Sequence, residues 1–120
     1  MKKFGKISPH LPVRDVRETI RWYEERLGFS EPWFWGDPPS DGGCRRDDLR
    51  VLFGKADPFV PPQDLSLILF VSGIDEVYEE IVERGHKILS PVKTYDYGIR
   101  EFAIEDVNGY YLRFAESVEV

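Results

Sequence analysis

The sequence predicts an α+β fold built from two equivalent modules, each containing a strand, a helix and three further strands. The main observation is a repeat: an apolar strand, an acidic residue, an amphipathic helix and a glycine follow one another over residues 7–29 and again over residues 65–85. Segments rich in β-forming residues come after each helix. Two such modules in 120 residues indicate a core made from paired halves. A groove between paired halves is a natural place for a ligand.

The first helix is predicted by its start signal, its periodicity and its stop signal. Asp15 can cap the helix, and Glu18 lies three residues later, as in a capping box. Gly28 ends the helix. Apolar residues recur at intervals of four, three and four, so we expect one buried stripe made of Val16, Ile20, Tyr23 and Leu27.

The second helix has the same organisation. Ser72 or Asp75 is the expected N-cap, and Gly85 is the expected stop. The predicted buried stripe consists of Val77, Tyr78, Ile81 and Val82.

The remaining strands and loops follow from composition. The predicted strands include residues 33–35, 49–53, 88–89, 100–104 and 110–114, with a hairpin turn at 106–109. A mobile loop is expected over residues 36–43, beside an aromatic cluster. We expect a single domain over residues 1–120, with an N-terminal module at 1–55, a linker at 56–64 and a C-terminal module at 65–120.

The composition is that of an ordinary globular protein, with 42% hydrophobic and 32% charged residues. No apolar run approaches the roughly 20 residues that a membrane-spanning helix needs, so no membrane association is expected. The basic start of the chain lacks the apolar stretch of a signal peptide, and we expect a cytoplasmic protein. Cys44 is the one cysteine, so it cannot form an internal disulfide.

The formal net charge of −6 argues against binding to nucleic acid and is favourable for a cationic small molecule. The same charge could serve solubility alone. Both interpretations stay open at this point.

Several short motifs, in order, resemble those of one superfamily. They are residues 11–15, 22–23, 27–29, 46–48, 71–75 and 100–102, followed by Asp106 and Asn108-Gly109. Together they resemble the vicinal oxygen chelate superfamily, which includes glyoxalase I, extradiol dioxygenases, fosfomycin resistance enzymes and bleomycin resistance proteins. The resemblance implies the glyoxalase/bleomycin resistance fold, in which two βαβββ modules form a curled mixed sheet shaped like a cup. The blocks at 46–48 and 100–102 look most like the bleomycin resistance branch, which implies a homodimer with ligand clefts lined by both chains.

The resemblance also indicates which positions would hold a metal ion in related enzymes. These positions fall on Ser8, Ser66 and Arg113, with one more near Leu52. A hydroxyl is a poor ligand and a guanidinium does not deprotonate, so we expect no metal and no other cofactor. A shifted register that uses His10, Glu101 and Glu105 is the alternative metal site.

Aromatic residues provide the candidate binding surface. Trp33 and Trp35 alternate with Phe34, so the tryptophans cannot share a face with that phenylalanine. Flat aromatic walls suit a planar ligand, although a core or dimer contact would explain the same residues. The resemblance implies stacking by Trp33 and Tyr97. The complete set of candidate ligand contacts is His10, Trp33, Trp35, Phe53, Tyr95, Tyr97, Arg100, Phe102 and Arg113.

The sequence contains no serine or cysteine arrangement typical of nucleophilic catalysis and no glycine-rich phosphate loop, so we assign no catalytic residue. The expected function is that of a metal-free protein that sequesters a planar, cationic ligand such as a bleomycin-like drug. The first alternative is a lyase or isomerase that uses His10 with Arg113 and Arg100. The second is a module that binds an unidentified metabolite.

Overall fold

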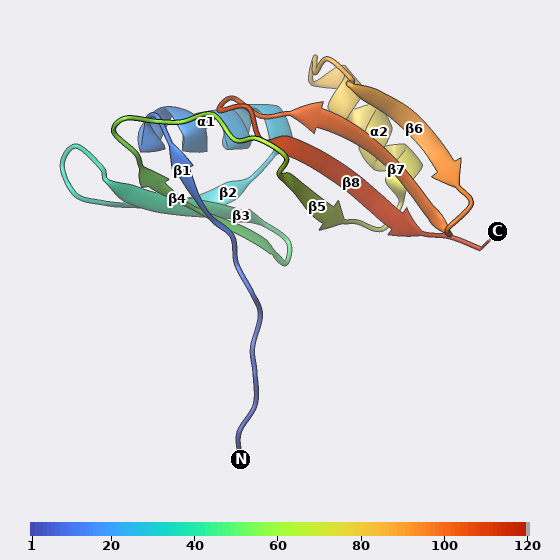
Figure 1. Ribbon diagram of the computed structural model, residues 1–120, viewed down its shortest axis with the longest axis horizontal. Coiled ribbons are helices and arrows are strands. Elements are labelled where there is room, and N and C mark those ends of the chain that lie inside the picture. Colours follow the sequence, from blue (N-terminus) through green and yellow to red (C-terminus); the bar gives the residue numbers. More distant parts are fainter. Residues whose placement is uncertain (120) are drawn as a thin grey trace. The chain divides into compact units, whose positions relative to one another are not determined.

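The computed structural model describes residues 1–119, and the chain forms two compact units, Met1–Phe59 and Val60–Val120 (Figure 1). Each unit contains one helix and one four-stranded mixed sheet. The predicted α+β class with two βαβββ modules is therefore confirmed. The division between the units falls inside residues 56–64, the stretch predicted as a linker.

The N-terminal unit consists of β1 (His10–Val13), α1 (Val16–Leu27), β2 (Ser30–Trp35), β3 (Asp41–Arg46) and β4 (Leu49–Lys55). Its strands lie in the order β1-β4-β3-β2. β1 runs parallel to β4, whereas the β4–β3 and β3–β2 pairs are antiparallel.

The C-terminal unit repeats this topology. It consists of β5 (Ser66–Phe70), α2 (Ile74–Glu83), β6 (Ser90–Tyr95), β7 (Ile99–Glu105) and β8 (Tyr111–Ser117). The strand order is β5-β8-β7-β6, with the β5–β8 pair parallel and the other two pairs antiparallel.

Helix α1 begins and ends where the sequence predicts. The Asp15 carboxylate accepts a hydrogen bond from the backbone N–H of Glu18 at 2.8 Å, and Gly28 ends the helix in the left-handed conformation. The whole predicted stripe is buried: Val16, Ile20, Tyr23 and Leu27. These signals are local, which explains why they can be read from the sequence.

Helix α2 is capped differently from the prediction. The N-cap is Gly73, at a φ of 74°, rather than Ser72 or Asp75. The carboxylate of Glu116, on β8, accepts hydrogen bonds from the N–H groups of Gly73 and Ile74, each at 3.1 Å. The cap therefore comes from a distant strand, so no local sequence signal could predict it.

The buried side of α2 also differs in part. Ile74 and Ile81 are buried, Val77 and Tyr78 are half-buried, and Val82 is exposed. Within residues 1–119, no helix is both long enough and apolar enough to cross a membrane.

Two strands differ from the prediction and one turn agrees with it. Strand β3 occupies residues 41–46, so the predicted loop over 36–43 is shorter, and β6 lies at 90–95 rather than at 88–89. A Cβ at Gly42 would lie 2.8 Å from a Val16 side-chain atom and 2.9 Å from an Ile20 atom, so this glycine lets α1 approach β3. The hairpin at 106–109 is confirmed, because the Asp106 carboxylate accepts hydrogen bonds from the N–H groups of Asn108 and Tyr110.

Each unit has its core between its helix and one face of its sheet. In the N-terminal unit, Tyr23 of α1 contacts Phe29 and Phe53, with ring centroids 5.4 and 5.1 Å apart. In the C-terminal unit, Phe102 contacts Tyr78 of α2 at 5.0 Å and Phe114 at 4.9 Å. The opposite face of each sheet is not covered by a helix of its own unit, and it presents the side chains considered next.

Candidate functional site

The face of the N-terminal sheet that points away from α1 is here called the N-terminal open face. Strand register arranges its residues in rows across β1, β4, β3 and β2. The central row contains His10, Leu52, Gly43 and Trp33. The next row contains Pro12, Gly54, Asp41 and Trp35. Residues that are far apart in the sequence thus lie side by side on one surface.

Trp33 lies over Gly43 on this face. A Cβ at Gly43 would be 2.8 Å from the Trp33 Nε1 and 2.9 Å from a methyl carbon of Leu52, so the indole and the leucine occupy the space that a side chain would need. Trp33 is 44% exposed and Trp35 is 69% exposed. Phe34 turns to the other face, where the Arg17 guanidinium lies 4.9 Å from its ring centre. This is the alternation that the sequence predicts for the three aromatic residues.

His10 forms an ion-pair contact with Asp41 on the same face. The distance from His10 Nε2 to Asp41 Oδ1 is 3.0 Å, and both side chains are about half exposed. The contact depends on Gly54, because a Cβ there would lie 2.9 Å from His10 Cε1. The contact sets a carboxylate against the imidazole and holds the ring in one orientation on this face.

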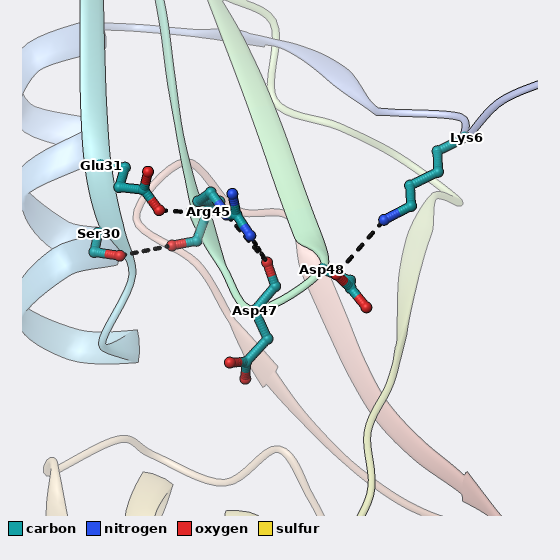
Figure 2. A network of polar contacts seen from close by, with 6 residues as sticks. All are labelled: Lys6, Ser30, Glu31, Arg45, Asp47 and Asp48. Atoms are coloured by element: carbon teal, nitrogen blue, oxygen red, sulfur yellow. Dashed lines mark hydrogen bonds and ion pairs between the residues drawn. The ribbon is translucent and has the colours of Figure 1, made fainter.

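A polar network borders the central row on its other side (Figure 2). Arg45 donates to the backbone carbonyl of Asp47 through Nε at 3.1 Å and Nη2 at 2.8 Å, and it pairs with Glu31 at 3.5 Å. Lys6 pairs with Asp48 at 3.6 Å. A cavity of about 290 Å³ lies here, lined by Lys6, Ile7, Ser8, Arg45, Asp47, Asp48 and Arg50.

The C-terminal sheet has an equivalent open face, here called the C-terminal open face. Register places Ile68 of β5 beside Arg113 of β8, and Phe70 beside Ala115. Ile68 and Phe70 are 46% and 61% exposed. A cavity of about 610 Å³ lies at one end of the sheet, lined by Pro62, Asp64, Leu65, Ser66, Leu89, Glu105, Gly109, Tyr111 and Arg113.

On this face, Glu101 contacts two of the predicted contact residues, and one of these two stacks on a third. The Arg113 guanidinium donates to both Glu101 carboxylate oxygens, at 2.9 to 3.3 Å, and the Tyr97 hydroxyl donates to Oε1 at 3.1 Å. The Tyr97 ring stacks on Tyr95, with centroids 5.3 Å apart and planes inclined by 16°. Desolvation, followed by the hydrogen bond to Glu101, raises the pKa of Tyr97. From the sequence, Glu101 is predicted only as a possible metal ligand.

Three predicted contact residues face the helices instead. Phe53 and Phe102 are 0% exposed and belong to the cores described above. Arg100 donates to Asp75 of α2 at 2.8 and 3.1 Å and to Thr94 at 3.0 Å. Because side chains alternate along a strand, Arg100 and Phe102 share the face that α2 covers. We therefore omit all three from the proposed ligand contacts.

The positions that the resemblance predicts as metal ligands have side chains that do not suit a metal ion. Leu52 offers only carbon atoms, Ser66 offers a hydroxyl, and Arg113 is already paired with Glu101. Among residues 1–119, no three His, Cys, Asp or Glu side chains lie close enough together to hold a metal ion. The alternative set joins His10 of the N-terminal unit to Glu101 and Glu105 of the C-terminal unit, and it stays a prediction.

Comparisons with known proteins agree with this architecture. A crystal structure of the bleomycin-binding protein from bleomycin-producing Streptomyces verticillus, complexed with copper(II)-bleomycin, is 26% identical over 100% of both chains, with a TM-score of 0.77. TioX from Micromonospora sp. ML1 is 16% identical, covering 96% of this chain and 100% of that chain, with a TM-score of 0.76. A virulence protein from Salmonella typhimurium is 24% identical, covering 98% of this chain and 100% of its own, with a TM-score of 0.72.

A search of curated proteins found no match. The family model described as the Glyoxalase/Bleomycin resistance protein/Dioxygenase superfamily matches residues 4–114. The two βαβββ modules, their uncovered sheet faces and this match lead to one conclusion: the chain belongs to the glyoxalase/bleomycin resistance protein/dioxygenase superfamily.

Proposed function

We propose that this protein binds a planar, conjugated small molecule of the bleomycin type and sequesters it without chemical change. The observation that carries the proposal is the pair of exposed tryptophans on the N-terminal open face, with Trp33 held over Gly43 beside Leu52. A protein that binds copper(II)-bleomycin is 26% identical over the full chain, which supports this ligand class.

The proposed ligand has a cationic end. Asp41 lies in the same row as Trp35, so a positive group beside a stacked ring would meet a carboxylate. The net charge of −6 favours cations over the whole molecule. Asp41 has a second oxygen besides the one that contacts His10.

We propose a homodimer as the binding form. Offset stacking adds roughly 0.5 to 1.5 kcal/mol per ring, whereas micromolar affinity needs about 8 kcal/mol. Enclosure of the ligand between two copies would supply the missing burial. Ile68 and Phe70 on the C-terminal open face are exposed apolar side chains of the kind that a second copy would cover.

The experiment is a titration with copper(II)-bleomycin and with metal-free bleomycin, followed by tryptophan fluorescence and by calorimetry. We expect quenching with micromolar affinity. Trp33→Leu should weaken binding by about tenfold, because it removes the ring while keeping an apolar side chain. Trp22→Phe is the control, since Trp22 lies on α1 beside Tyr23. No heat and no quenching at tens of micromolar drug would contradict the drug assignment.

The His10–Asp41 contact favours a second candidate, an enzyme of the same superfamily that transfers a proton to or from its ligand. Mass spectrometry of the ligand after long incubation separates the two candidates. A ligand recovered unchanged supports sequestration. A ligand altered by the wild type, and unaltered by His10→Gln, supports the enzyme.

A further inference from the structure

We propose that the N-terminal open face contains an anion-binding subsite, formed by Arg45 and Arg50 one row away from Trp33. It would take the carboxylate, sulfate or phosphate group of a ligand whose ring contacts the tryptophan. The anion subsite does not depend on the proposed function. The inference that the ligand also has an aromatic ring does depend on the proposed function.

Strand register places the subsite beside the aromatic row. Arg45 and Arg50 are directly opposite each other on β3 and β4, and Gly43 and Leu52 form the next pair on the same face. Trp33 lies opposite Gly43. Successive rows on one face of a sheet are about 7 Å apart, since each residue advances the strand by about 3.4 Å. A ligand with a ring and an anionic group at about this separation would reach both rows.

The two arginines differ in how their charges are compensated. Like charges directly opposite each other on a sheet are unfavourable. Arg45 is partly neutralised by Glu31 and by the Asp47 carbonyl. Arg50 is exposed, and within residues 1–119 no hydrogen bond or ion pair joins its guanidinium to another side chain. A bound anion would therefore relieve the repulsion between the two arginines.

Besides Glu31, which pairs with Arg45, two carboxylates line the cavity, and within residues 1–119 neither of them forms an ion pair with Arg45 or Arg50. Asp48 pairs with Lys6 at 3.6 Å. Asp47 offers Arg45 its backbone carbonyl, and its carboxylate points away from Arg45 (Figure 2). The cavity of about 290 Å³ that Arg45 and Arg50 help to line is large enough for a small oxyanion group. A guanidinium binds such a group through two parallel hydrogen bonds.

With this subsite, the N-terminal open face has positive side chains at one end of its strands and a negative side chain at the other. Arg45 and Arg50 form one end, Leu52 and Trp33 lie in the middle row, and Asp41 lies in the row beyond. A planar ligand with an anionic group at one end and a cationic group at the other would match all three rows. This order of charges distinguishes such a ligand from one that is cationic only.

The test compares fluorene-2-carboxylate with fluorene-2-carboxamide by calorimetry. The two probes share a planar ring system and differ in the charge of one group. We expect the wild type to bind the carboxylate about tenfold more tightly, because charge-assisted hydrogen bonds are stronger than neutral ones. Arg50→Gln should remove most of this preference, because it weakens binding of the carboxylate more than binding of the amide. High salt should reduce the preference in the wild type.

Arg21→Gln is the matched control, since it removes the same charge from an exposed position on α1. A control that loses the preference as fully as Arg50→Gln would overturn the local subsite in favour of a general charge effect. Equal affinity of the wild type for both probes would overturn the subsite while leaving the aromatic surface intact.

A second measurement applies even if neither fluorene compound binds. Inorganic phosphate is titrated into the wild-type protein while NMR follows the side-chain Nε–H resonances of arginine. Shifts at Arg45 and Arg50, with none at Arg21, support the subsite. The failure of the fluorene compounds to bind then counts only against an aromatic ligand. If the three resonances respond alike, or none responds, the proposed subsite is wrong.

Discussion

Two glycines determine where the largest side chains of the N-terminal open face can lie. Without a side chain at Gly43, the Trp33 indole can rest against the sheet beside Leu52. Without one at Gly54, the His10 ring can cross the strand and reach Asp41. The positions of the proposed contact residues thus depend on residues that contact no ligand themselves.

Gly43→Ala should destabilise the protein by about 1 to 3 kcal/mol, because its Cβ would lie too close to its neighbours. The nearest atoms include the backbone carbonyl oxygen of Val51 at 2.8 Å, which has little freedom to move. Thermal unfolding measures the loss. Gly5→Ala is the control, since no atom lies within 4 Å of a Cβ at that position. Equal stability of the two variants would contradict the close packing at Gly43.

Cys44 is buried on β3, and burial, followed by the charge of Glu24, raises the pKa of its thiol to about 12. We expect no reaction with iodoacetamide in the native protein at pH 8 and rapid reaction after unfolding, because the thiolate is the reactive form. Mass spectrometry of the alkylated protein measures this. Rapid labelling of the native protein would show that the thiol is accessible.

The same shift predicts how stability depends on pH. The unfolded thiol has the ordinary pKa of 9.0, whereas the folded thiol has a pKa of about 12. The unfolded state therefore releases the proton first, so the contribution of Cys44 is complete below pH 9.0 and is lost as the pH rises toward about 12. Wild type should lose more stability than Cys44→Ala over this range in thermal unfolding. Parallel curves for the two proteins would argue against the shift.

At the scale of the element, the two helices obtain their N-caps in different ways. Asp15 caps α1 from the adjacent position in the chain. Helix α2 depends on Glu116, which also places a negative charge at the positive end of the helix dipole. The link ties α2 to the last strand of its own sheet.

Glu116→Ala should lower the stability of the C-terminal unit by roughly 1 to 2 kcal/mol, because two N–H groups of α2 lose their acceptor. Glu116→Gln should lose less, since its amide oxygen can still accept one hydrogen bond. Chemical denaturation followed by circular dichroism measures both. Glu79→Ala, at an exposed position in the middle of α2, is the control and should change stability little. A loss as large in the control would mean that removing a negative charge from the unit, rather than losing the cap, is responsible.

At the scale of the whole molecule, the proposed homodimer can be tested without any ligand. The side chain of Phe70 is 61% exposed on the C-terminal open face. We expect the wild type to sediment as a dimer and Phe70→Asp to sediment as a monomer, because a charge would be desolvated at the contact. Analytical ultracentrifugation measures both. Lys87→Asp, at another exposed position, should leave the dimer intact. A monomeric wild type at all concentrations would rule out the proposed dimer.

The agreement between sequence and structure depends on how local each signal is. The N-cap, the apolar stripe and the stop of helix α1 were predictable, because these signals lie close together along the chain, whereas the burial of Thr19 was not predicted. The opposite orientations of Trp33 and Phe34 were predictable from strand alternation alone. The side of the sheet that Arg100 faces was not, because alternation relates neighbouring residues but does not identify the face covered by a helix.

The sequence by itself determined the fold class and the two modules, since these follow from periodicity and turn chemistry along the chain. Its short motifs resemble those of the superfamily whose family model matches residues 4–114. Only the tertiary structure decided which side chains meet. The examples are the contacts of Glu101 with Arg113 and Tyr97, of Asp41 with His10, and of Glu116 with α2. These contacts depend on strand register and helix placement, which arise when the whole sheet packs and which no short segment contains.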